Sequence, residues 1–251
     1  MNNLYLLGAI MAGLIAGSFF GMLIPRLHNN EKGIVAGRSH CPQCKHILKA
    51  RNLIPVLSFA FQKGRCSFCR KKISIIYPLI ELTTALAFGA LYLQVPQLDL
   101  WLIWAIMFGF LILIFYYDLR YQEIHDAFML PAILFALLAA IYLGRSADAL
   151  VGSAIGGAFF ALQWLVSKGR WVGSGDIRIG AFMGLMLGFQ YTVAALFLSY
   201  VLGTIASIFL LATKKATKKS MIPLGPFLAL ASALTFFYGD RLIDWYLNLM
   251  V

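Results

Sequence analysis

Charged residues are scarce in this sequence. Asp, Glu, Lys and Arg make up 12% of its 251 residues, whereas hydrophobic residues make up 61%, and the mean hydropathy is +0.81. Soluble domains carry roughly 25% charged residues. The chain therefore has too little polar surface for a water-soluble protein, and its composition instead predicts a protein that lies in lipid.

Long polar stretches are also lacking, because a single sizeable polar segment interrupts the apolar runs. A helix needs about 20 apolar residues to cross the hydrocarbon core of a membrane, where each backbone group must be hydrogen-bonded within its own segment. We therefore expect an all-α polytopic membrane protein with about eight transmembrane helices. The predicted spans are residues 4–24, 75–94, 99–117, 127–143, 148–166, 176–190, 191–212 and 222–238.

The polar segment divides the chain into three predicted parts. These are a first transmembrane helix over residues 1–24, a small cytoplasmic zinc-ribbon-like domain over 25–74 and a transmembrane core over 75–251. The first apolar run lacks the charged n-region and the small-x-small cleavage site of a secretory signal peptide. We therefore expect it to be a membrane span.

Basic residues are distributed unevenly along the chain. When eight spans are threaded alternately through a membrane, 19 of the 21 Lys and Arg residues fall on one side, and only Arg145 and Arg241 fall on the other. Cytoplasmic loops carry the excess of Lys and Arg, so both termini are predicted to lie outside the cytoplasm. Anionic membrane lipid explains a net charge of +11, and we expect no nucleic-acid partner.

The chain has only four cysteines, and all of them lie in the polar segment, as Cys41-x-x-Cys44 and Cys66-x-x-Cys69. This spacing is typical of a zinc ribbon, in which two tight turns each present two thiolates to one tetrahedral ion. Four cysteines fill the coordination shell, so we expect a structural Zn²⁺. Two disulfides are the alternative, but such bonds rarely persist in the reducing cytoplasm.

Acidic residues are few, with ten in the chain, and three of them stand out. Glu81, Asp118 and Asp176 lie within or beside apolar runs, where an ionisable residue is costly and indicates function. Asp118 ends the third predicted span and Asp176 begins the sixth, so the topology places both at the cytoplasmic boundary. Each aspartate alone is also compatible with ordinary solvation near a helix end.

Two carboxyl groups that meet at this boundary can act as an aspartyl dyad. One activates a water molecule as a base, while the other donates a hydrogen bond to the carbonyl of a peptide bond. Asp176 lies at a predicted helix N-terminus, which favours an anion, and Asp118 lies at a C-terminus, so we expect Asp176 to be the base. Gly173 and Gly175 permit a sharp active-site turn and the close approach of a substrate strand.

An ordered set of motifs across nearly the whole chain resembles the type IV prepilin peptidases, which belong to the GxGD class of aspartyl proteases. The cysteine pairs and the two aspartates are part of this resemblance, and motifs in or beside several spans complete it. These are Gly17-Ser18-Phe19, Asn52-Leu-Ile-Pro55, Tyr77-Pro78-Leu-Ile-Glu81-Leu82, Gly173-x-Gly175-Asp176 and Ile222-Pro223-Leu-Gly225-Pro226.

The resemblance implies an inner-membrane enzyme that removes a short basic leader from prepilins of type IV pili and from pseudopilins of type II secretion. It implies that Asp118 and Asp176 are the catalytic pair. Family members with the cysteine segment typically also methylate the new N-terminal residue, using S-adenosylmethionine. The sequence itself shows no independent site for that cofactor.

Two positions depart from the family pattern. The family often has Ile-Pro-Asn or a similar run after the first aspartate, where this chain has Ile124-His125-Asp126. It usually has Lys where this chain has Arg178. Neither departure removes a catalytic carboxylate.

A basic leader must approach a basic face, which requires a local negative potential. The loop after the third span supplies it, and we expect Glu123 and Asp126 to help bind the leader. Glu81, inside the second span, is open to two interpretations. It contacts the substrate helix or an amine, or it is a hydrogen-bonded carboxylate in helix packing.

Two functions of other classes are kept as alternatives. A membrane transporter could use Asp118 and Asp176 as a proton relay, although the sequence has no convincing inverted repeat of the kind that such folds favour. A zinc-ribbon membrane scaffold would leave the carboxylates incidental. Replacing either aspartate with Asn separates a scaffold, which survives the change, from a protease, which does not.

Overall fold

The computed structural model describes residues 2–31, 37–215, 217 and 220–250 of the chain. Within these ranges the chain forms nine α-helices and one short 3-10 helix, and no β-strand. The predicted all-α class is therefore confirmed.

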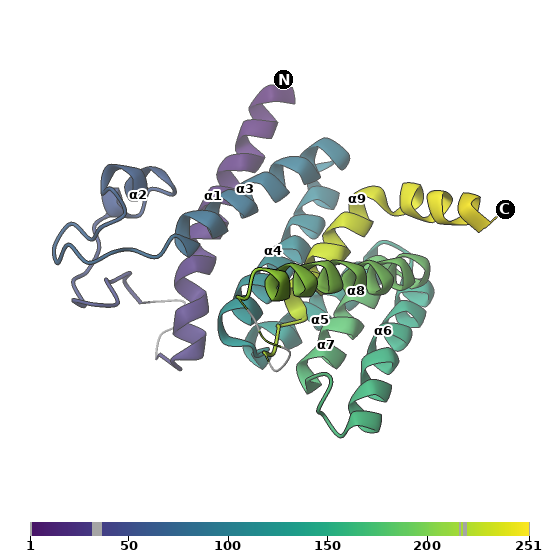
Figure 1. The fold of residues 1–251 in the computed structure, drawn as a ribbon. Coiled ribbons are helices and arrows are strands. Elements are labelled where there is room, and N and C mark those ends of the chain that lie inside the picture. Colours follow the sequence, from purple (N-terminus) through teal and green to yellow (C-terminus); the bar gives the residue numbers. More distant parts are fainter. Residues whose placement is uncertain (1, 32–36, 216, 218–219, 251) are drawn as a thin grey trace. The chain divides into compact units, whose positions relative to one another are not determined.

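The helices form two compact units, residues 1–112 and 113–251, and the long helix α4 runs from the first unit into the second. The first unit contains the polar segment with all four cysteines. Its elements are α1 (Asn2–His28), η1 (Ala50–Asn52), α2 (Leu57–Phe61), α3 (Ile76–Gln94) and the first part of α4 (Leu98–Tyr121) (Figure 1).

Glycines on α1 let it pack closely against α3. A Cβ atom added at Gly13 would lie 2.6 Å from Cα of Ala85, and one added at Gly17 would lie 2.6 Å from Cα of Glu81. Residues four apart share one face of a helix, and small residues at this spacing are typical of membrane helices whose backbones approach closely. This contact fixes Glu81 beside α1.

The second unit holds both candidate aspartates. Asp118 lies near the end of α4, and Asp176 lies at the start of α7. The other elements follow in chain order. They are α5 (Asp126–Tyr142), α6 (Ser146–Ser167), α7 (Ser174–Leu187), α8 (Phe189–Ala212) and α9 (Gly225–Met250) (Figure 1).

Helix α7 packs on α6 through a second set of glycines. A Cβ atom at Gly156 would lie 2.2 Å from the carbonyl oxygen of Gly180, and one at Gly152 would lie 2.7 Å from that of Gly184. The two backbones therefore meet with no side chain between them. Since α7 carries Asp176 at its start, this contact contributes to the position of that carboxylate.

Each of the eight predicted spans corresponds to a helix, although their lengths differ. Among the described residues, five helices are long and apolar enough to cross a membrane: α1, α3, α4, α6 and α8. The polytopic membrane prediction is thus confirmed. Helix α5 has 17 residues. Helix α7 has 14, and at about 1.5 Å per residue it is shorter than the roughly 30 Å hydrocarbon core.

The predicted boundary between the sixth and seventh spans, at residues 190 and 191, lies slightly too late. Helix α7 ends at Leu187, and Gly188 alone separates it from α8. Gly188 has a φ of +81°, a conformation that residues with a Cβ atom rarely adopt. The apolar run continues through this glycine, so hydropathy alone did not locate the break.

Replacing Gly156 with Ala tests the contact between α6 and α7. The added Cβ meets backbone atoms of Gly180 that cannot move aside, so we expect the free energy of unfolding to fall by about 1–3 kcal/mol. Unfolding in detergent micelles, followed by circular dichroism, measures the change. Gly157→Ala is the matched control, because its Cβ would lie 3.7 Å from Cβ of Ala181, an ordinary contact. Equal stability of the two variants would contradict the proposed close contact.

Candidate active site and cysteine domain

Asp118 lies in the last turn of α4 and is 7% exposed. Its Oδ2 accepts a hydrogen bond of 2.8 Å from the backbone N–H of Gly225, the first residue of α9. A helix N-terminus presents free N–H groups and a positive end of the helix dipole, both of which stabilise an anion. The carboxylate of Asp118 is therefore held by the start of α9, more than a hundred residues further along the chain.

Gly225 leaves no room for a side chain beside this carboxylate. A Cβ atom at Gly225 would lie 2.6 Å from Oδ2 and 3.0 Å from Cγ of Asp118. The sequence analysis noted the motif that contains Gly225 but assigned it no role. A pattern of residues does not reveal that two segments so distant in sequence approach this closely.

Asp176 occupies the third position of α7. Its Oδ2 accepts a hydrogen bond of 2.8 Å from the backbone N–H of Gly173, the residue that precedes the helix. This is one half of a capping box, and glycine has no side chain to form the other half. The two glycines before Asp176 thus form the turn that the sequence predicted, with the carboxylate folded back onto it.

The segments that carry the two carboxylates meet within the second unit. Arg178, two residues after Asp176, pairs with Asp126, eight residues after Asp118. A Cβ atom at Gly175 would lie 2.9 Å from Cβ of Ile124. Two carboxylates that come together can share one proton, leaving one as a base and the other as a hydrogen-bond donor.

One expectation about the roles of the pair loses its basis. Asp176 was expected to be the base because it lies at a helix N-terminus, which favours an anion, whereas Asp118 lies at a helix C-terminus. Asp118 does lie near the end of α4, but its carboxylate also binds the N-terminus of α9. Both carboxylates therefore accept an N–H from the start of a helix, and helix ends no longer distinguish them.

The loop after Asp118 was predicted to supply acidic groups. Glu123 is exposed and its Oε1 accepts a hydrogen bond of 3.2 Å from the hydroxyl of Tyr117. Asp126 forms an ion pair with Arg178, two residues after Asp176. Asp126 thus has a cationic partner within the second unit. The sequence did not predict that partner.

The four cysteines gather at one point in the first unit. Their sulfur atoms all lie within 4.8 Å of one another, and Sγ of Cys41 lies 3.9 Å from Sγ of Cys69. Four sulfurs bound tetrahedrally at about 2.3 Å from zinc are separated by about 3.8 Å. The arrangement therefore has the dimensions of a metal site with four thiolate ligands, and all four thiols are free in the structure.

The two cysteine pairs have equivalent backbone geometry. The N–H of Lys45 donates to the carbonyl of Cys41, and the N–H of Arg70 donates to the carbonyl of Cys66. Lys45 and Arg70 both have a positive φ, 57° and 58°. Hydrogen bonds from the backbone N–H groups of Cys69 and Phe68 lower the pKa of the Cys66 thiol to about 7, whereas desolvation and the neighbouring thiols raise the pKa of the Cys44 thiol to about 11. The geometry of the four sulfurs, and not the acidity of one thiol, therefore supports the metal site.

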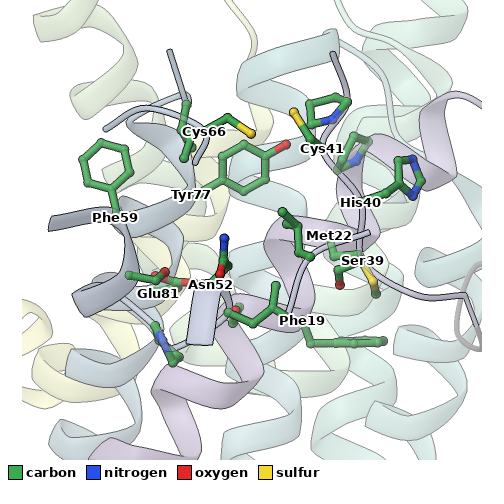
Figure 2. Close-up of a pocket in the computed structure, with 18 of the residues that line it drawn as sticks. Phe19, Met22, Ser39, His40, Cys41, Asn52, Phe59, Cys66, Tyr77 and Glu81 are labelled. Carbon is green, nitrogen blue, oxygen red and sulfur yellow. The ribbon is translucent and has the colours of Figure 1, made fainter. Parts of the chain in front are cut away.

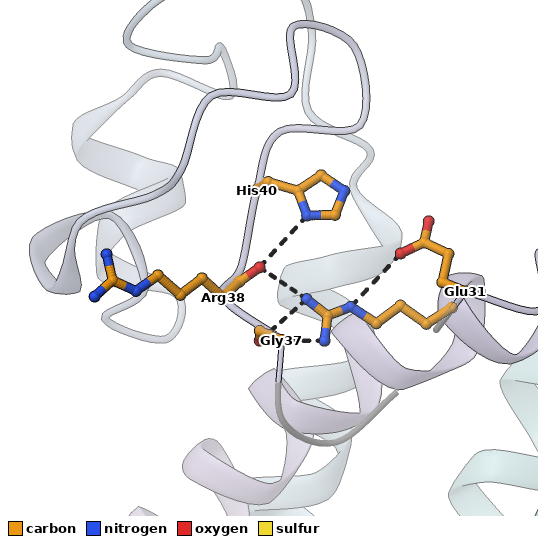
Figure 3. A network of polar contacts seen from close by, with 5 residues as sticks. Glu31, Gly37, Arg38 and His40 are labelled. Atoms are coloured by element: carbon orange, nitrogen blue, oxygen red, sulfur yellow. Dashed lines mark hydrogen bonds and ion pairs between the residues drawn. The ribbon is translucent and has the colours of Figure 1, made fainter. Parts of the chain in front are cut away.

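A buried guanidinium attaches the cysteine domain to α1. Arg26, in the last turn of α1, is 5% exposed and donates hydrogen bonds to the carbonyl oxygens of Gly37 and Arg38 (Figure 3). It also forms an ion pair of 3.8 Å with Glu31. Because Gly37 and Arg38 lie four and three residues before Cys41, the network helps to set where the first cysteine pair lies relative to α1.

A cavity of about 530 Å³ lies in the first unit between α1, the cysteine domain and the start of α3. Its wall combines aromatic rings with a few polar side chains, and Figure 2 shows that they come from all three segments. The labelled lining residues are Phe19, Met22, Ser39, His40, Cys41, Asn52, Phe59, Cys66, Tyr77 and Glu81.

Glu81 is the buried carboxylate of this cavity, with 9% of its surface exposed. Its Oε2 accepts a hydrogen bond of 2.7 Å from the backbone N–H of Val56, and Ser18 lines the same cavity. Val56 has φ 61° and ψ −51°, a strained conformation for a β-branched residue. Glu81 therefore holds a strained turn of the cysteine domain at the edge of the cavity.

Comparison with known proteins places this architecture in a family. Residues 11–95 match the model of the bacterial peptidase A24 N-terminal domain, and residues 105–208 match that of the type IV leader peptidase family. The prepilin leader peptidase/N-methyltransferase of Bacillus subtilis (strain 168) is 36% identical over 94% of this chain and 96% of its own length. The chain belongs to the type IV leader peptidase family.

Relatives of the same name occur in other bacteria. The one from Aeromonas salmonicida (strain A449) is 32% identical over 92% of this chain and 82% of its own length. The one from Pseudomonas aeruginosa is 29% identical over 97% and 94%. No solved structure matches the chain.

The two family models divide the features described above. The leader peptidase model includes both Asp118 and Asp176, whereas the N-terminal domain model includes the cysteines and the cavity.

Proposed function

We propose that this chain is a prepilin peptidase and N-methyltransferase, with Asp118 and Asp176 as the peptidase dyad. The observation that supports the peptidase role is that the segments carrying the two carboxylates, the loop after α4 and the start of α7, meet in the second unit. Each carboxylate uses Oδ2 to accept a backbone N–H. That leaves Oδ1 of each for a shared proton and a water molecule.

The dyad would hydrolyse the peptide bond between the leader and the mature pilin. The ionised carboxylate removes a proton from water, which attacks the carbonyl carbon. The protonated carboxyl donates a hydrogen bond to the carbonyl oxygen as it becomes negative. A proton then goes to the leaving amine, the C–N bond breaks, and the products are the leader carboxylate and the new N-terminus.

Asp118→Asn and Asp176→Asn test the dyad. Each change keeps the shape of the side chain but removes a group that must exchange a proton, so we expect cleavage of a prepilin by the purified protein to fall at least about 100-fold. Asp99→Asn is the matched control, because Asp99 is the exposed acidic residue at the other end of α4. Full cleavage by either dyad variant with an intact fold would reject the aspartyl mechanism. If the chain is a scaffold, neither change alters its function.

The methyltransferase role requires S-adenosylmethionine, and the cavity of the first unit fits such a ligand. Its volume of about 530 Å³ lies in the range of small-molecule sites. Phe59 and Tyr77 offer aromatic faces for the adenine, and Asn52 and Glu81 offer polar contacts. The cofactor supplies an electrophilic methyl group. The wall residues would bind and orient it. Glu81 is placed to take a proton from the N-terminal ammonium, since only the neutral amine can accept the methyl group.

Phe59→Ala tests whether this cavity binds S-adenosylmethionine. Loss of one aromatic ring against a nucleobase costs about 1–3 kcal/mol, so we expect the Kd to rise about 5- to 150-fold in isothermal titration calorimetry. Phe61→Ala is the control, since Phe61 lies on the same short helix but is 82% exposed and does not line the cavity. Equal affinities of these two variants would exclude the cavity as the cofactor site.

The cysteine cluster is proposed to bind one structural Zn²⁺. Four thiolates close the coordination sphere, so the ion holds the two cysteine turns together and leaves no position for substrate. His40 and His46 flank the first turn, but the ring of His46 packs against that of Phe68, with ring centroids 3.4 Å apart in a tilted contact. The four sulfurs alone account for the site.

Metal analysis of the purified protein tests this site. We expect about one zinc per chain by plasma emission spectrometry, and loss of most of it in Cys66→Ser, because a tetrahedral site that lacks one thiolate binds weakly. His46→Ala should keep the metal. A wild-type protein without zinc and without titratable thiols would instead support the disulfide alternative.

The loop after α4 is proposed to bind the basic leader. Glu123 and Asp126 are both exposed, and Asp126 also pairs with Arg178. An exposed carboxylate at this position can attract a basic leader. The uneven distribution of Lys and Arg supports a cytoplasmic location for this loop, with the chain in the inner membrane and both termini on the other side.

Glu123→Gln tests leader recognition. An exposed charge pair contributes about 0.2–1 kcal/mol, so the KM for a basic leader should rise by about 1.5- to 5-fold, with kcat unchanged. A peptide whose leader lysines and arginines are replaced by glutamine is the control substrate. Its KM should be the same for both enzymes, and an equal rise for both peptides would discard the role.

A further inference from the structure

The connection between α4 and α5 is attached to the start of α7. A Cβ atom at Gly175 would lie 2.9 Å from Cβ of Ile124, so these segments approach as closely as a glycine allows. The next residue, His125, is the N-cap of α5, and its Nδ1 accepts the N–H of Ala127 at 3.1 Å. The connection therefore enters α5 in a fixed direction directly beside α7.

An ion pair forms a second attachment at the following residue. The guanidinium of Arg178 contacts the carboxylate of Asp126. Asp126 follows Asp118 by eight residues, and Arg178 follows Asp176 by two. The side chains of the pair are 30% and 58% exposed, and exposed ion pairs contribute little to stability. Stability of the fold therefore does not account for the pair, which instead joins the two segments that carry the dyad.

Asp126 and Arg178 are also the charged positions at which this chain departs from the family pattern described above. The carboxylate of Asp126 cancels the charge of Arg178 and fits its planar donor group. The two departures therefore meet in space.

Pairing with Asp126 also keeps the guanidinium of Arg178 away from the dyad carboxylates. Residues two apart on a helix face different directions, but an arginine side chain is long enough to turn toward a neighbouring carboxylate. An Arg178 held by Asp126 does not form a salt bridge with the dyad. Such a bridge would remove one carboxylate from the pair that has to share a proton.

We propose that Asp126 and Arg178 are positioning residues that fasten the α4–α5 connection to α7 and thereby set the spacing between Asp118 and Asp176. The predicted effect on the cleavage rate rests on the proposed peptidase function. The predicted effect on the distance between the α4–α5 connection and α7 does not depend on activity. In this proposal Asp126 positions the dyad, and Glu123 remains the proposed contact for the leader.

A distance measurement on the full-length protein in nanodiscs tests the attachment itself. Spin labels carried by genetically encoded residues at Ala127 and Trp171, both exposed, report the separation of the start of α5 from the segment before α7 by pulsed electron resonance. We expect a narrow distribution for the otherwise unchanged protein and for Arg178→Lys. Asp126→Ala and Arg178→Ala should each broaden it. Unchanged distributions in both alanine variants would overturn the proposal.

Kinetics on the same variants without labels test the consequence for the dyad. A misplacement of about 1 Å can cost about 100-fold in rate, so kcat for prepilin cleavage should fall about 10- to 100-fold in Asp126→Ala and in Arg178→Ala. The double variant should be no slower than either single one, because both changes break the same attachment. Arg178→Lys should stay within about threefold of wild type. Arg120→Ala, which removes a cation from the same end of α4, should leave kcat unchanged.

The distance measurement and the kinetics together distinguish a failure of the positioning role from a failure of the proposed peptidase function. An effect on KM that appears only with basic leaders would overturn the positioning role and return Asp126 to leader binding. Multiplied effects in the double variant would also overturn it. If the wild-type protein or Asp99→Asn cleaved no prepilin, the peptidase function would fail, and the label distances would still decide whether the ion pair fastens α7.

Discussion

The site depends on two carboxylates held near each other beside apolar segments. Two like charges repel, and burying a carboxylate is costly unless hydrogen bonds stabilise it. The fold meets this constraint with helix N-termini, since Gly225 at the start of α9 binds Asp118 and Gly173 before α7 binds Asp176. Glycine is required beside Asp118 because a Cβ atom would occupy the place of the carboxylate.

The remainder of the second unit positions these helix starts. The short helix α7 is fixed along its length by backbone contact with α6, and at its first residues by the connection after α4. A helix of 14 residues is too short to reach across the hydrocarbon core. It carries an aspartate at one end and is held by its neighbours, which suits a carrier of a catalytic group better than a simple membrane anchor.

The sequence predicted the parts of the molecule whose signals are local. Hydropathy located eight helices, the spacing of the cysteines indicated their cluster, and scarcity of charge within apolar runs drew attention to Asp118, Asp176 and Glu81. It could not predict contacts between distant segments. The N–H of Gly225 on Asp118, the pairing of Arg178 with Asp126 and the support of Val56 by Glu81 depend on how helices pack, and the first of these removed the basis for choosing which aspartate is the base.

The central claim is that Asp118 and Asp176 act on one water molecule and one peptide bond. An experimental structure of the protein with a pilin peptide whose scissile amide is replaced by a hydroxyl-bearing analogue tests this most directly. The account predicts that the hydroxyl lies within hydrogen-bond distance, about 2.6–3.2 Å, of a carboxylate oxygen of both aspartates. A bound analogue whose hydroxyl contacts only one of them, with the other carboxylate beyond reach, would contradict it.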